Sequence, residues 1–303
     1  MSRGRLREKV AARTESAAPC RGEAGRVNGS VGRWLLALGA LLGRLAFALH
    51  IRRRVALEGL LRAFPEKTPR ERRRIARASY AQLGRSLVEI ALARRTPDAE
   101  LARLVSFDGW EKFEPTRAAG RGAVFAVGHY GNWELLGRAF ARRGLPLTAI
   151  TRTLRGAFNQ RLLAARREGG MRELPEKGST RAALEVLRRG ETLAIVVDQN
   201  MRPRRGLFVD FFGAPACTTP AAAVFSLRGG APLFAAFPVR QPDGTHRVQF
   251  HGPFTTALQG HAAVVDLTQQ LTRAVEDAVR AHPDHWFWVH RRWKTRPPPE
   301  AAR

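Results

Sequence analysis

The sequence predicts an α/β fold in which a central, largely parallel sheet is covered by helices and preceded by N-terminal helices. Short apolar runs bounded by turn residues are typical of buried strands, and they occur at residues 123–127, 147–151, 193–197 and 233–239. Amphipathic stretches typical of helices lie between them, near residues 132–143, 156–168, 180–189 and 219–228. Strands that alternate with helices in this way favour parallel pairing, with helices on both faces of the sheet.

Length and composition fit one domain of this class. The chain has 303 residues, of which 44% are hydrophobic, so it can bury a substantial core and is not a disordered protein. We expect a mobile basic arm at residues 1–30, a single domain at 31–296 and a short tail at 297–303. Cys20 and Cys217 are too few for a disulfide framework or a cysteine-based metal site, so both are expected to be free thiols.

The most apolar segment, residues 34–51, predicts a membrane-associated helix. It contains 18 residues with Arg44 among them, whereas a spanning helix needs about 20 apolar residues. On a helical wheel one apolar stripe faces away from Arg33 and Arg44, which favours a helix lying in the membrane interface. The stripe consists of Leu35, Leu38, Leu42, Leu45 and Leu49, whereas Leu36, Phe47 and Ile51 fall outside it. A strained spanning helix and a cleaved signal peptide are the alternatives.

A second N-terminal helix is predicted to begin at residues 68–71 and to run to about residue 93. Thr68 supplies the N-cap, Pro69 occupies the first helical position, and Glu71 completes a capping box. The arginines that follow are expected to form a solvated face.

His129 and Glu134 are the most distinctive candidates for chemistry. They lie where a predicted buried strand meets the following helix, and ligands of open α/β sheets bind at the carboxyl ends of strands. Gly128 and Gly131 allow a tight turn and close approach of a substrate. Glu134 is expected to accept a hydrogen bond from one imidazole nitrogen and so raise the basicity of the other. The pair therefore predicts a general base, with a purely structural histidine as the alternative.

The segment 128–134, Gly-His-Tyr-Gly-Asn-Trp-Glu, resembles the His-x4-Asp/Glu motif of the lysophospholipid acyltransferase superfamily, in its lipid A biosynthesis branch. Further similarity lies at residues 63–66, 197–199, 206–213 and 285–294. The resemblance implies an O-acyltransferase that moves a fatty acyl group from an acyl thioester to a hydroxyl of a membrane lipid. A lipid A precursor is the expected acceptor, and a phosphatidylinositol mannoside is the alternative.

The same resemblance implies roles for individual residues. His129 would act as the base, and Glu134 would stabilise the imidazolium. Arg152, which follows a predicted strand, would bind a lipid phosphate or a developing oxyanion, with a plain surface arginine as the less favoured alternative.

Three further residues complete the predicted substrate site. Asn132 lies within the motif, and Arg166 is placed near it by the resemblance, with a plain surface arginine as an equal alternative. Asp198, at another predicted strand end, is expected to orient Arg152 through an ion pair. Residues 198–200 read Asp-Gln-Asn where glycerolipid relatives carry Pro-Glu-Gly, so the phosphate-binding role of that loop is not carried over.

The strongly basic composition is consistent with the partners that this interpretation implies. The net charge is +26, with 52 Lys and Arg against 26 Asp and Glu. Anionic membrane lipids, an anionic acceptor and an acidic acyl carrier protein would all suit such a surface. No metal or bound cofactor is expected, and the donor, acyl-carrier protein or acyl-coenzyme A, is a co-substrate.

A nucleic-acid-binding protein is the competing class, but the chain shows no zinc-finger, RNP-type or basic-zipper pattern. We expect an enzyme on the cytoplasmic face of the inner membrane. The cluster of Trp286, Trp288 and Trp293 is consistent either with a core edge or with an amphipathic surface at lipid headgroup depth.

Overall fold

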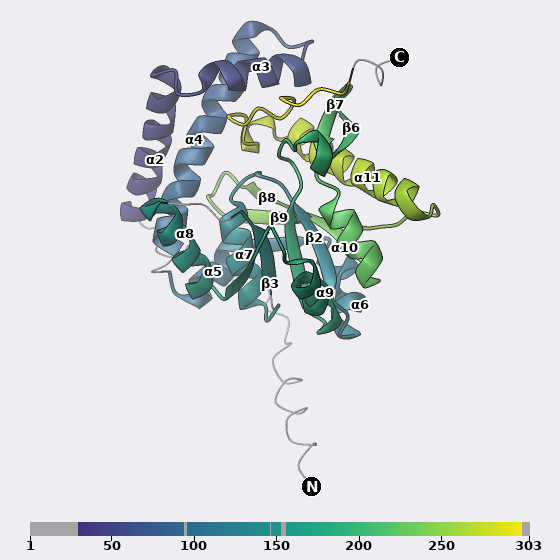
Figure 1. Cartoon of the computed structure of the whole chain (residues 1–303). Helices are drawn as coiled ribbons and strands as arrows, with labels where there is room; N and C mark the ends of the chain where they lie inside the picture. The colour runs from purple at the N-terminus through teal and green to yellow at the C-terminus, as the bar shows by residue number, and fades with distance from the viewer. Residues whose placement is uncertain (1–29, 94–95, 146, 153–155, 299–303) are drawn as a thin grey trace.

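The computed structural model describes residues 30–93, 96–145, 147–152 and 156–298 (Figure 1). The predicted arm up to residue 29, Cys20 and most of the predicted tail lie outside these ranges.

A seven-stranded sheet in the order β1-β9-β8-β2-β5-β3-β4 forms the centre of the fold. Neighbouring strands pair in parallel except β8 and β9, which are antiparallel. The strands are β1 Val105–Asp108, β2 Ala123–Val127, β3 Leu147–Thr151, β4 Met171–Pro175, β5 Thr192–Val196, β8 Leu233–Arg240 and β9 His246–Phe254. The predicted α/β class with a largely parallel sheet is therefore confirmed.

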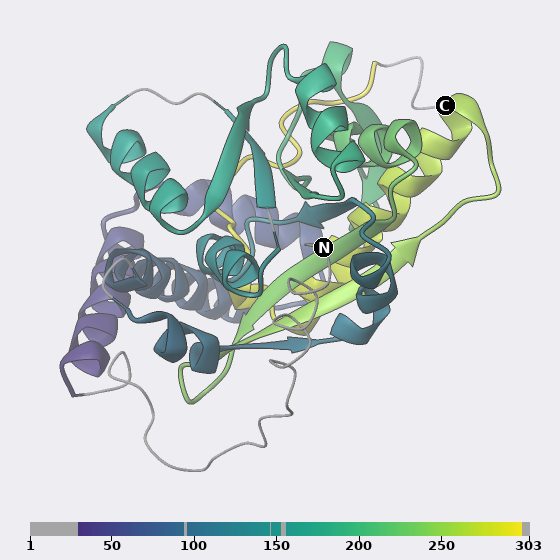
Figure 2. The same ribbon diagram turned by 90° about the horizontal axis from the view of Figure 1, so that it is seen from below.

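Helices cover both faces of this sheet (Figures 1 and 2). They are α5 Asp98–Leu104, α6 Glu114–Ala118, α7 Trp133–Arg142, α8 Ala157–Glu168, α9 Thr180–Arg188, α10 Ala221–Gly229 and α11 Gly260–Ala281, with short 3-10 turns η2 Trp110–Lys112, η3 Pro203–Arg205 and η4 Pro283–His285. The sheet separates two hydrophobic cores, one on each face. Strand β2 contributes to both, because its side chains alternate between the faces. Val124 and Ala126 pack in the core beneath α9, α10 and α11, whereas Phe125 packs in the core beneath α7.

The four predicted strands and four predicted helices agree with the structure to within two residues. Strands β1, β4 and β9 and the hairpin of β6 Leu207–Phe211 and β7 Ala214–Thr218 were not predicted. Charged or polar residues interrupt β4 and β9, so neither reads as an apolar run. The hairpin turn places Phe212 and Gly213 at φ 57° and 70°, the left-handed geometry that tight two-residue hairpins use.

In the described residues, three longer helices come before α5 and the sheet, namely α2 Ser30–Ala48, α3 Arg53–Ala63 and α4 Pro69–Ala93, with α2 and α4 packed side by side (Figure 1). The predicted capping box is confirmed: the Thr68 amide donates to Glu71 at 2.7 Å, and the Glu71 amide donates to the Thr68 hydroxyl at 3.3 Å. Glycines set the spacing between α2 and α4. A Cβ on Gly43 would lie 2.0 Å from the Tyr80 carbonyl oxygen, and one on Gly84 would lie 2.0 Å from that of Gly39.

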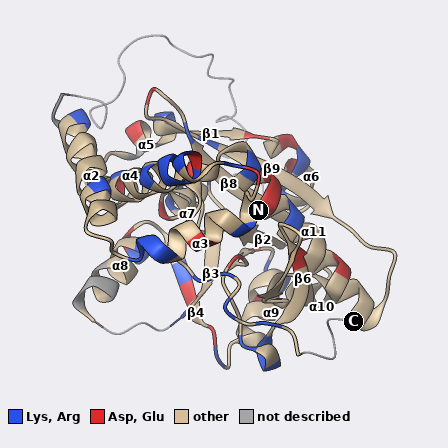
Figure 3. Ribbon diagram, turned by 90° about the horizontal axis from the view of Figure 1, so that it is seen from above, with Lys and Arg blue, Asp and Glu red and all other residues tan. Residues whose placement is uncertain are grey.

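This packing explains which face of α2 is buried. Leu36 and Phe47, which fall outside the predicted stripe, are buried against the protein. The stripe itself stays uncovered: Leu38, Leu42, Leu45 and Leu49 are exposed, Leu35 is half-buried, and α2 is mostly free of charge (Figure 3). The helix ends at Ala48, short of the predicted residue 51, where the chain turns into α3.

Within the described part of the chain, no helix on its own is long and apolar enough to cross a membrane. The bent pair Gly32–Ala48 and Arg53–Ala63, with an angle of 89° between its helices, meets the length and composition test only when taken together.

The tryptophan cluster belongs to the core. Trp286, Trp288 and Trp293 are 3%, 1% and 9% exposed, so the core-edge interpretation is right and the lipid-facing one is wrong. Arg292 lies fully buried beside them, where its guanidinium donates to the carbonyl oxygen of Cys217 at 3.0 Å. Cys217 is a buried free thiol, as predicted.

The glycine contacts yield a prediction about stability. Gly43→Ala should lower the free energy of unfolding by about 1–3 kcal/mol, because the added methyl group forces α2 away from α4. Denaturant unfolding of the detergent-solubilised protein measures this loss. Arg44→Ala, at an exposed site one residue further on, is the matched control and should change stability by less than about 0.5 kcal/mol. Equal effects of the two substitutions would contradict the close-packing account.

Candidate active site

His129 and Asp198 meet at the carboxyl edge of the sheet. His129 lies two residues beyond β2 and Asp198 two residues beyond β5, and these strands are parallel neighbours. The imidazole Nδ1 lies 2.8 Å from Asp198 Oδ1, and the His129 amide donates to Asp198 Oδ2 at 2.7 Å. Adjacent strand ends therefore join two residues that are 69 positions apart in the sequence.

The environment of Asp198 determines the state of the imidazole. The carboxylate is buried and also accepts a hydrogen bond from the indole of Trp286 at 2.8 Å. Burial alone would raise the pKa of Asp198, but the charge of His129 and the hydrogen bonds from His129 and Trp286 lower it below its usual value. Since an ionised carboxylate only accepts hydrogen bonds, Nδ1 of His129 carries a proton, so that in the neutral form of the ring the free lone pair lies on Nε2.

The lone pair of His129 is directed at Gln199, whose side-chain nitrogen lies 3.1 Å from Nε2. An amide N–H is the group that suits an accepting Nε2. Aromatic rings flank the imidazole, with ring centroids at 5.0 Å for Trp133 and 5.8 Å for Phe287. One nitrogen is thus held by a carboxylate and the other by a neutral, displaceable donor.

The backbone around His129 is held by the C-terminal segment. Gly131 donates to the His285 carbonyl at 2.8 Å, and the Phe287 amide donates to the His129 carbonyl at 3.0 Å. Gly131 has φ 55°, and a Cβ there would lie 1.9 Å from the Pro238 carbonyl oxygen, so only glycine fits. Gly131, which was expected to allow a tight turn, is therefore required both by its positive φ and by this close contact.

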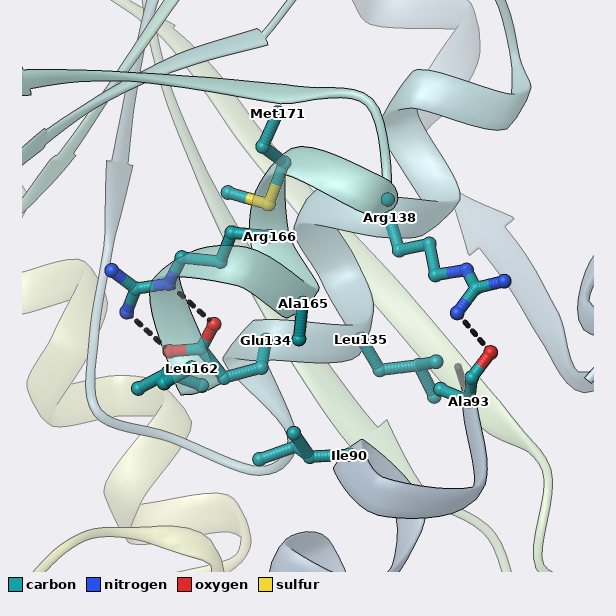
Figure 4. Close-up of a pocket in the computed structure, with 10 residues that line it drawn as sticks. Ile90, Ala93, Glu134, Leu135, Arg138, Leu162, Ala165, Arg166 and Met171 are labelled. Carbon is teal, nitrogen blue, oxygen red and sulfur yellow. Dashed lines mark hydrogen bonds and ion pairs between the residues drawn. The ribbon is translucent and has the colours of Figure 1, made fainter. Parts of the chain in front are cut away.

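Glu134 does not form the predicted hydrogen bond with His129, and this expectation is corrected. Its carboxylate accepts from the Arg166 guanidinium at 2.5 and 2.8 Å (Figure 4). It also accepts from the Trp133 indole at 3.0 Å. Glu134 sits in the first turn of α7 and extends toward α8, whereas Asp198 already occupies the Nδ1 side of the imidazole. Glu134 therefore reaches His129 only through the Trp133 ring.

Arg166 is not a plain surface arginine. It is largely buried, and it binds Glu173 at 2.8 Å as well as Glu134. Burial would lower the pKa of Arg166, but its hydrogen bonds to the two glutamates raise it. This ion pair borders a small cavity of about 30 Å³, which is also lined by Arg138 and by apolar residues such as Ile90, Leu162 and Met171 (Figure 4).

The predicted ion pair between Asp198 and Arg152 is also corrected. Arg152 is exposed, and its nearest acid is Glu176, 3.4 Å away, at the end of β4. Strand β3 carries Arg152 to the same edge of the sheet, but Asp198 is turned toward β2 and is saturated by His129 and Trp286.

Asn132 has a structural partner that the sequence analysis missed. It is buried, caps α7 by accepting from the Leu135 amide at 3.1 Å, and donates to Glu89 at 2.8 Å. Glu89 of α4 also binds Arg240 and lies 3.1 Å from His246 Nε2. Burial would raise the pKa of Glu89, but these partners hold it at about 2. The sequence feature that could have revealed this cluster is the position of Glu89 on the inner face of an amphipathic helix.

Metal ligands do not gather in the described residues, where no group of three or more His, Cys, Asp or Glu side chains is placed to hold an ion.

An α/β sheet that presents an oriented histidine at its carboxyl edge defines a site for general-base chemistry. Comparison with known families gives the particular class. Residues 32–295 match the family model of the bacterial lipid A biosynthesis acyltransferases, and the chain belongs to this family. It is accordingly an O-acyltransferase.

Individual relatives agree with this assignment. The chain is similar to the lipid A biosynthesis lauroyltransferase of Escherichia coli, with 27% identity over 86% of this chain and 85% of the relative. The palmitoleoyltransferase of the same organism is 26% identical over 88% and 86% of the two chains. A phosphatidylinositol mannoside acyltransferase of Mycobacterium tuberculosis is 27% identical over 71% and 69%.

The buried Glu89 cluster yields a prediction about stability and pH. Glu89→Gln should cost about 3–5 kcal/mol of unfolding free energy at pH 7, because Arg240 is left buried without a counter-charge. The folded-state pKa of Glu89 is lowered from its usual 4.5 to about 2, so this contribution is complete above about pH 4.5 and is lost as the pH falls toward 2. Denaturant unfolding between pH 7 and 2 measures the difference between the two proteins.

The matched control is Glu58→Gln, which breaks an exposed ion pair with Arg54 and should cost less than about 0.5 kcal/mol. If the difference in unfolding free energy between the wild type and Glu89→Gln grew as the pH fell, the predicted sign would be wrong.

Proposed function

We propose that this protein transfers a fatty acyl group from an acyl thioester to a hydroxyl of a membrane glycolipid, with His129 as the general base. Membership of the acyltransferase family supports the reaction class. The observation that carries the residue assignment is the His129–Asp198 contact of 2.8 Å at the sheet edge, which leaves Nε2 as the accepting nitrogen.

The chemical step follows from that geometry. The acceptor hydroxyl oxygen attacks the thioester carbonyl carbon while its proton passes to Nε2 of His129. Collapse of the tetrahedral intermediate breaks the carbon–sulfur bond, and the imidazolium returns the proton to the departing thiolate. An ester and a free thiol result. Asp198 holds the ring and stabilises the imidazolium that forms transiently, and it stays ionised throughout.

Gln199 marks the position of the acceptor. Its amide nitrogen occupies the hydrogen-bonding position of Nε2, 3.1 Å away, where the attacking hydroxyl has to lie. The hydroxyl must therefore displace this amide, which is then free to donate to the substrate.

Glu134 and Arg166 act on the base indirectly, through the ring of Trp133. Their bidentate contact and the Trp133–Glu134 hydrogen bond of 3.0 Å fix the ring that packs against His129. Because the motif glutamate supports the wall of the site, we assign it a positioning role in place of the predicted direct contact.

The acceptor and donor are proposed from the relatives. Those named for lipid A biosynthesis and the one named for phosphatidylinositol mannosides share a glycolipid as substrate class, and a lipid A precursor is the acceptor we propose for this chain. An acyl-carrier protein or acyl-coenzyme A would supply the thioester. Family membership gives no support to the nucleic-acid alternative.

We further propose that α2 attaches the enzyme to the cytoplasmic face of the inner membrane. The face of α2 that points away from α4 exposes large apolar side chains, among them Trp34 at 77% and Leu41 at 59%. The glycine contacts hold this face outward, since they fix the opposite side of α2 on α4. Basic residues near it suit anionic lipid headgroups.

The general-base assignment predicts the behaviour of two variants. His129→Ala and Asp198→Asn should each lower kcat by about 10²–10⁴-fold, and the double variant should be no slower than the slower single one, because the two residues act as a unit. The assay incubates purified protein with acyl-carrier-protein or acyl-coenzyme A donors and a lipid A precursor and records product masses.

His261→Ala, at an exposed position on α11, is the control and should leave kcat unchanged. Multiplicative effects of the His129 and Asp198 substitutions would show that the two residues work independently, contrary to the proposal.

The attachment proposal predicts weaker vesicle binding when the exposed face of α2 loses hydrocarbon. Leu42→Ser combined with Leu45→Ser should reduce partitioning to anionic vesicles at least about tenfold, because two leucines no longer enter the bilayer. Leu227→Ser with Leu258→Ser, at exposed sites elsewhere, is the matched control. Added salt should weaken binding of the wild type. Retention in alkaline carbonate, with the N-terminal arm protected from protease, would instead indicate a spanning anchor.

A further inference from the structure

The Gln199 side chain covers the reacting nitrogen of His129. Its amide nitrogen lies 3.1 Å from His129 Nε2, and the side chain is half-buried. The mechanism proposed above requires the acceptor hydroxyl to take this position, so the amide has to leave it during each turnover. The place to which the amide moves decides whether Gln199 only covers the base or takes part in the reaction.

The backbone of Gln199 is fixed on both sides. Asp198, which precedes it, is held by the three hydrogen bonds described above. The Asn200 amide, which follows it, donates to His290 Nε2 at 2.9 Å, and burial lowers the pKa of His290 to about 4, so this ring is neutral at pH 7 and can accept. The Asn200 side chain is bound to Thr295 at 2.9 and 3.0 Å. A side chain on such a backbone can return to the same positions in every turnover.

The thioester carbonyl has to lie next to the displaced amide. In a reactive arrangement the attacking oxygen and the carbonyl carbon are roughly 3–3.5 Å apart. Since the attacking oxygen takes the place of the Gln199 nitrogen, the carbonyl group lies beside that place. A donor stabilises an oxyanion from a distance of about 2.7–3.1 Å. Gln199 therefore needs only a change of side-chain rotamer to move from His129 to the carbonyl oxygen.

Three arginines near the carboxyl edge of the sheet are already engaged elsewhere. Arg152, which the resemblance offered for a developing oxyanion, is exposed and pairs with Glu176. Arg166 is held by two glutamates. Arg292 is fully buried and donates to a backbone carbonyl at 3.0 Å. Gln199, in contrast, contacts the proposed base directly.

A neutral donor suits this position. His129 gains a positive charge while negative charge develops on the carbonyl oxygen, and a cation beside the ring would disfavour the imidazolium. A primary amide stabilises the oxygen without opposing that charge. The rings of Trp133 and Phe287 lie 5.0 and 5.8 Å from the imidazole between centroids, and they reduce its contact with water. A hydrogen bond to a charged oxygen is stronger in such surroundings.

We propose that Gln199 is a catalytic residue whose side-chain N–H leaves His129 when the acceptor hydroxyl enters and donates to the carbonyl oxygen of the thioester. This inference rests on the proposed function. The hydroxyl oxygen bonds to the carbonyl carbon, its proton passes to His129 Nε2, and the π electron pair moves to the carbonyl oxygen, where Gln199 stabilises it. The pair then returns, the carbon–sulfur bond breaks, and the thiolate takes the proton from the imidazolium. Because the contact strengthens as charge develops, it raises kcat.

Gln199→Met tests the proposal, because methionine keeps the length of the side chain and removes its N–H donors. We expect kcat to fall about 10²–10³-fold, the usual cost of losing one oxyanion donor. KM for the acceptor should stay the same or fall, since no amide has to be displaced. The assay is the acyl transfer from either donor to a lipid A precursor. Gln259→Met, at an exposed site just before α11, is the matched control and should leave both constants unchanged.

Two unreactive analogues of the donor that the wild type uses separate this role from a structural one. In a thioether analogue a methylene group replaces the carbonyl, so Gln199 has no oxygen to bind. Its Kd should differ by less than about twofold between the wild type and Gln199→Met, which also shows that the variant folds. A trifluoromethyl ketone analogue forms a hydrate with two oxygens on a tetrahedral carbon. It should bind Gln199→Met at least about tenfold more weakly than the wild type.

Three results would overturn the proposal. One is a kcat of Gln199→Met equal to or above that of the wild type, because the amide would then only cover the base. The others are a lower kcat with unchanged binding of both analogues, which would indicate that Gln199 only positions His129, and an equal loss of affinity for both analogues. If the wild type itself transfers no acyl group from either donor, the proposed function fails and this inference with it, whereas an active wild type with an unaffected variant overturns this inference alone.

Discussion

The site depends on one buried carboxylate. Asp198 accepts three hydrogen bonds, from the His129 ring, the His129 amide and the Trp286 indole. Unpaired, a buried carboxylate would be costly and would take up a proton. With these donors it stays charged, fixes the imidazole tautomer and joins the ends of β2 and β5 to the C-terminal segment. The same contacts that stabilise the fold therefore orient the proposed base.

A second set of contacts links the N-terminal helices α2 and α4 to the loop of His129. Glycines hold α2 against α4, and Glu89 of α4 binds Asn132, which caps the helix that follows the loop of His129. The buried partners of Glu89 attach α4 to β8 and β9. In this arrangement the exposed face of α2 and His129 are fixed relative to each other, which is what the proposed reaction on a membrane-held acceptor would require.

The sequence was sufficient for the sheet, its helices and the position of His129, because buried parallel strands leave continuous apolar runs and their carboxyl ends are where sites form. It was not sufficient for the partners. Spacing made Glu134 the natural neighbour of His129, but the pairing of β2 with β5 brings Asp198 there, and strand order is a long-range property that local patterns do not contain. Arg166 then neutralises Glu134. The burial of Leu36 and Phe47 likewise depends on the close approach of α4, which a single helical wheel does not show.

The claim that Asp198, and not Glu134, sets the state of the base is tested most directly by nitrogen-15 NMR of histidine-labelled protein. The signal of His129 is assigned by its loss in His129→Gln. The account predicts that the neutral form of the ring carries its proton on Nδ1, unchanged in Glu134→Gln and altered in Asp198→Asn. A ring protonated on Nε2, or one that responds to Glu134→Gln but not to Asp198→Asn, would contradict it.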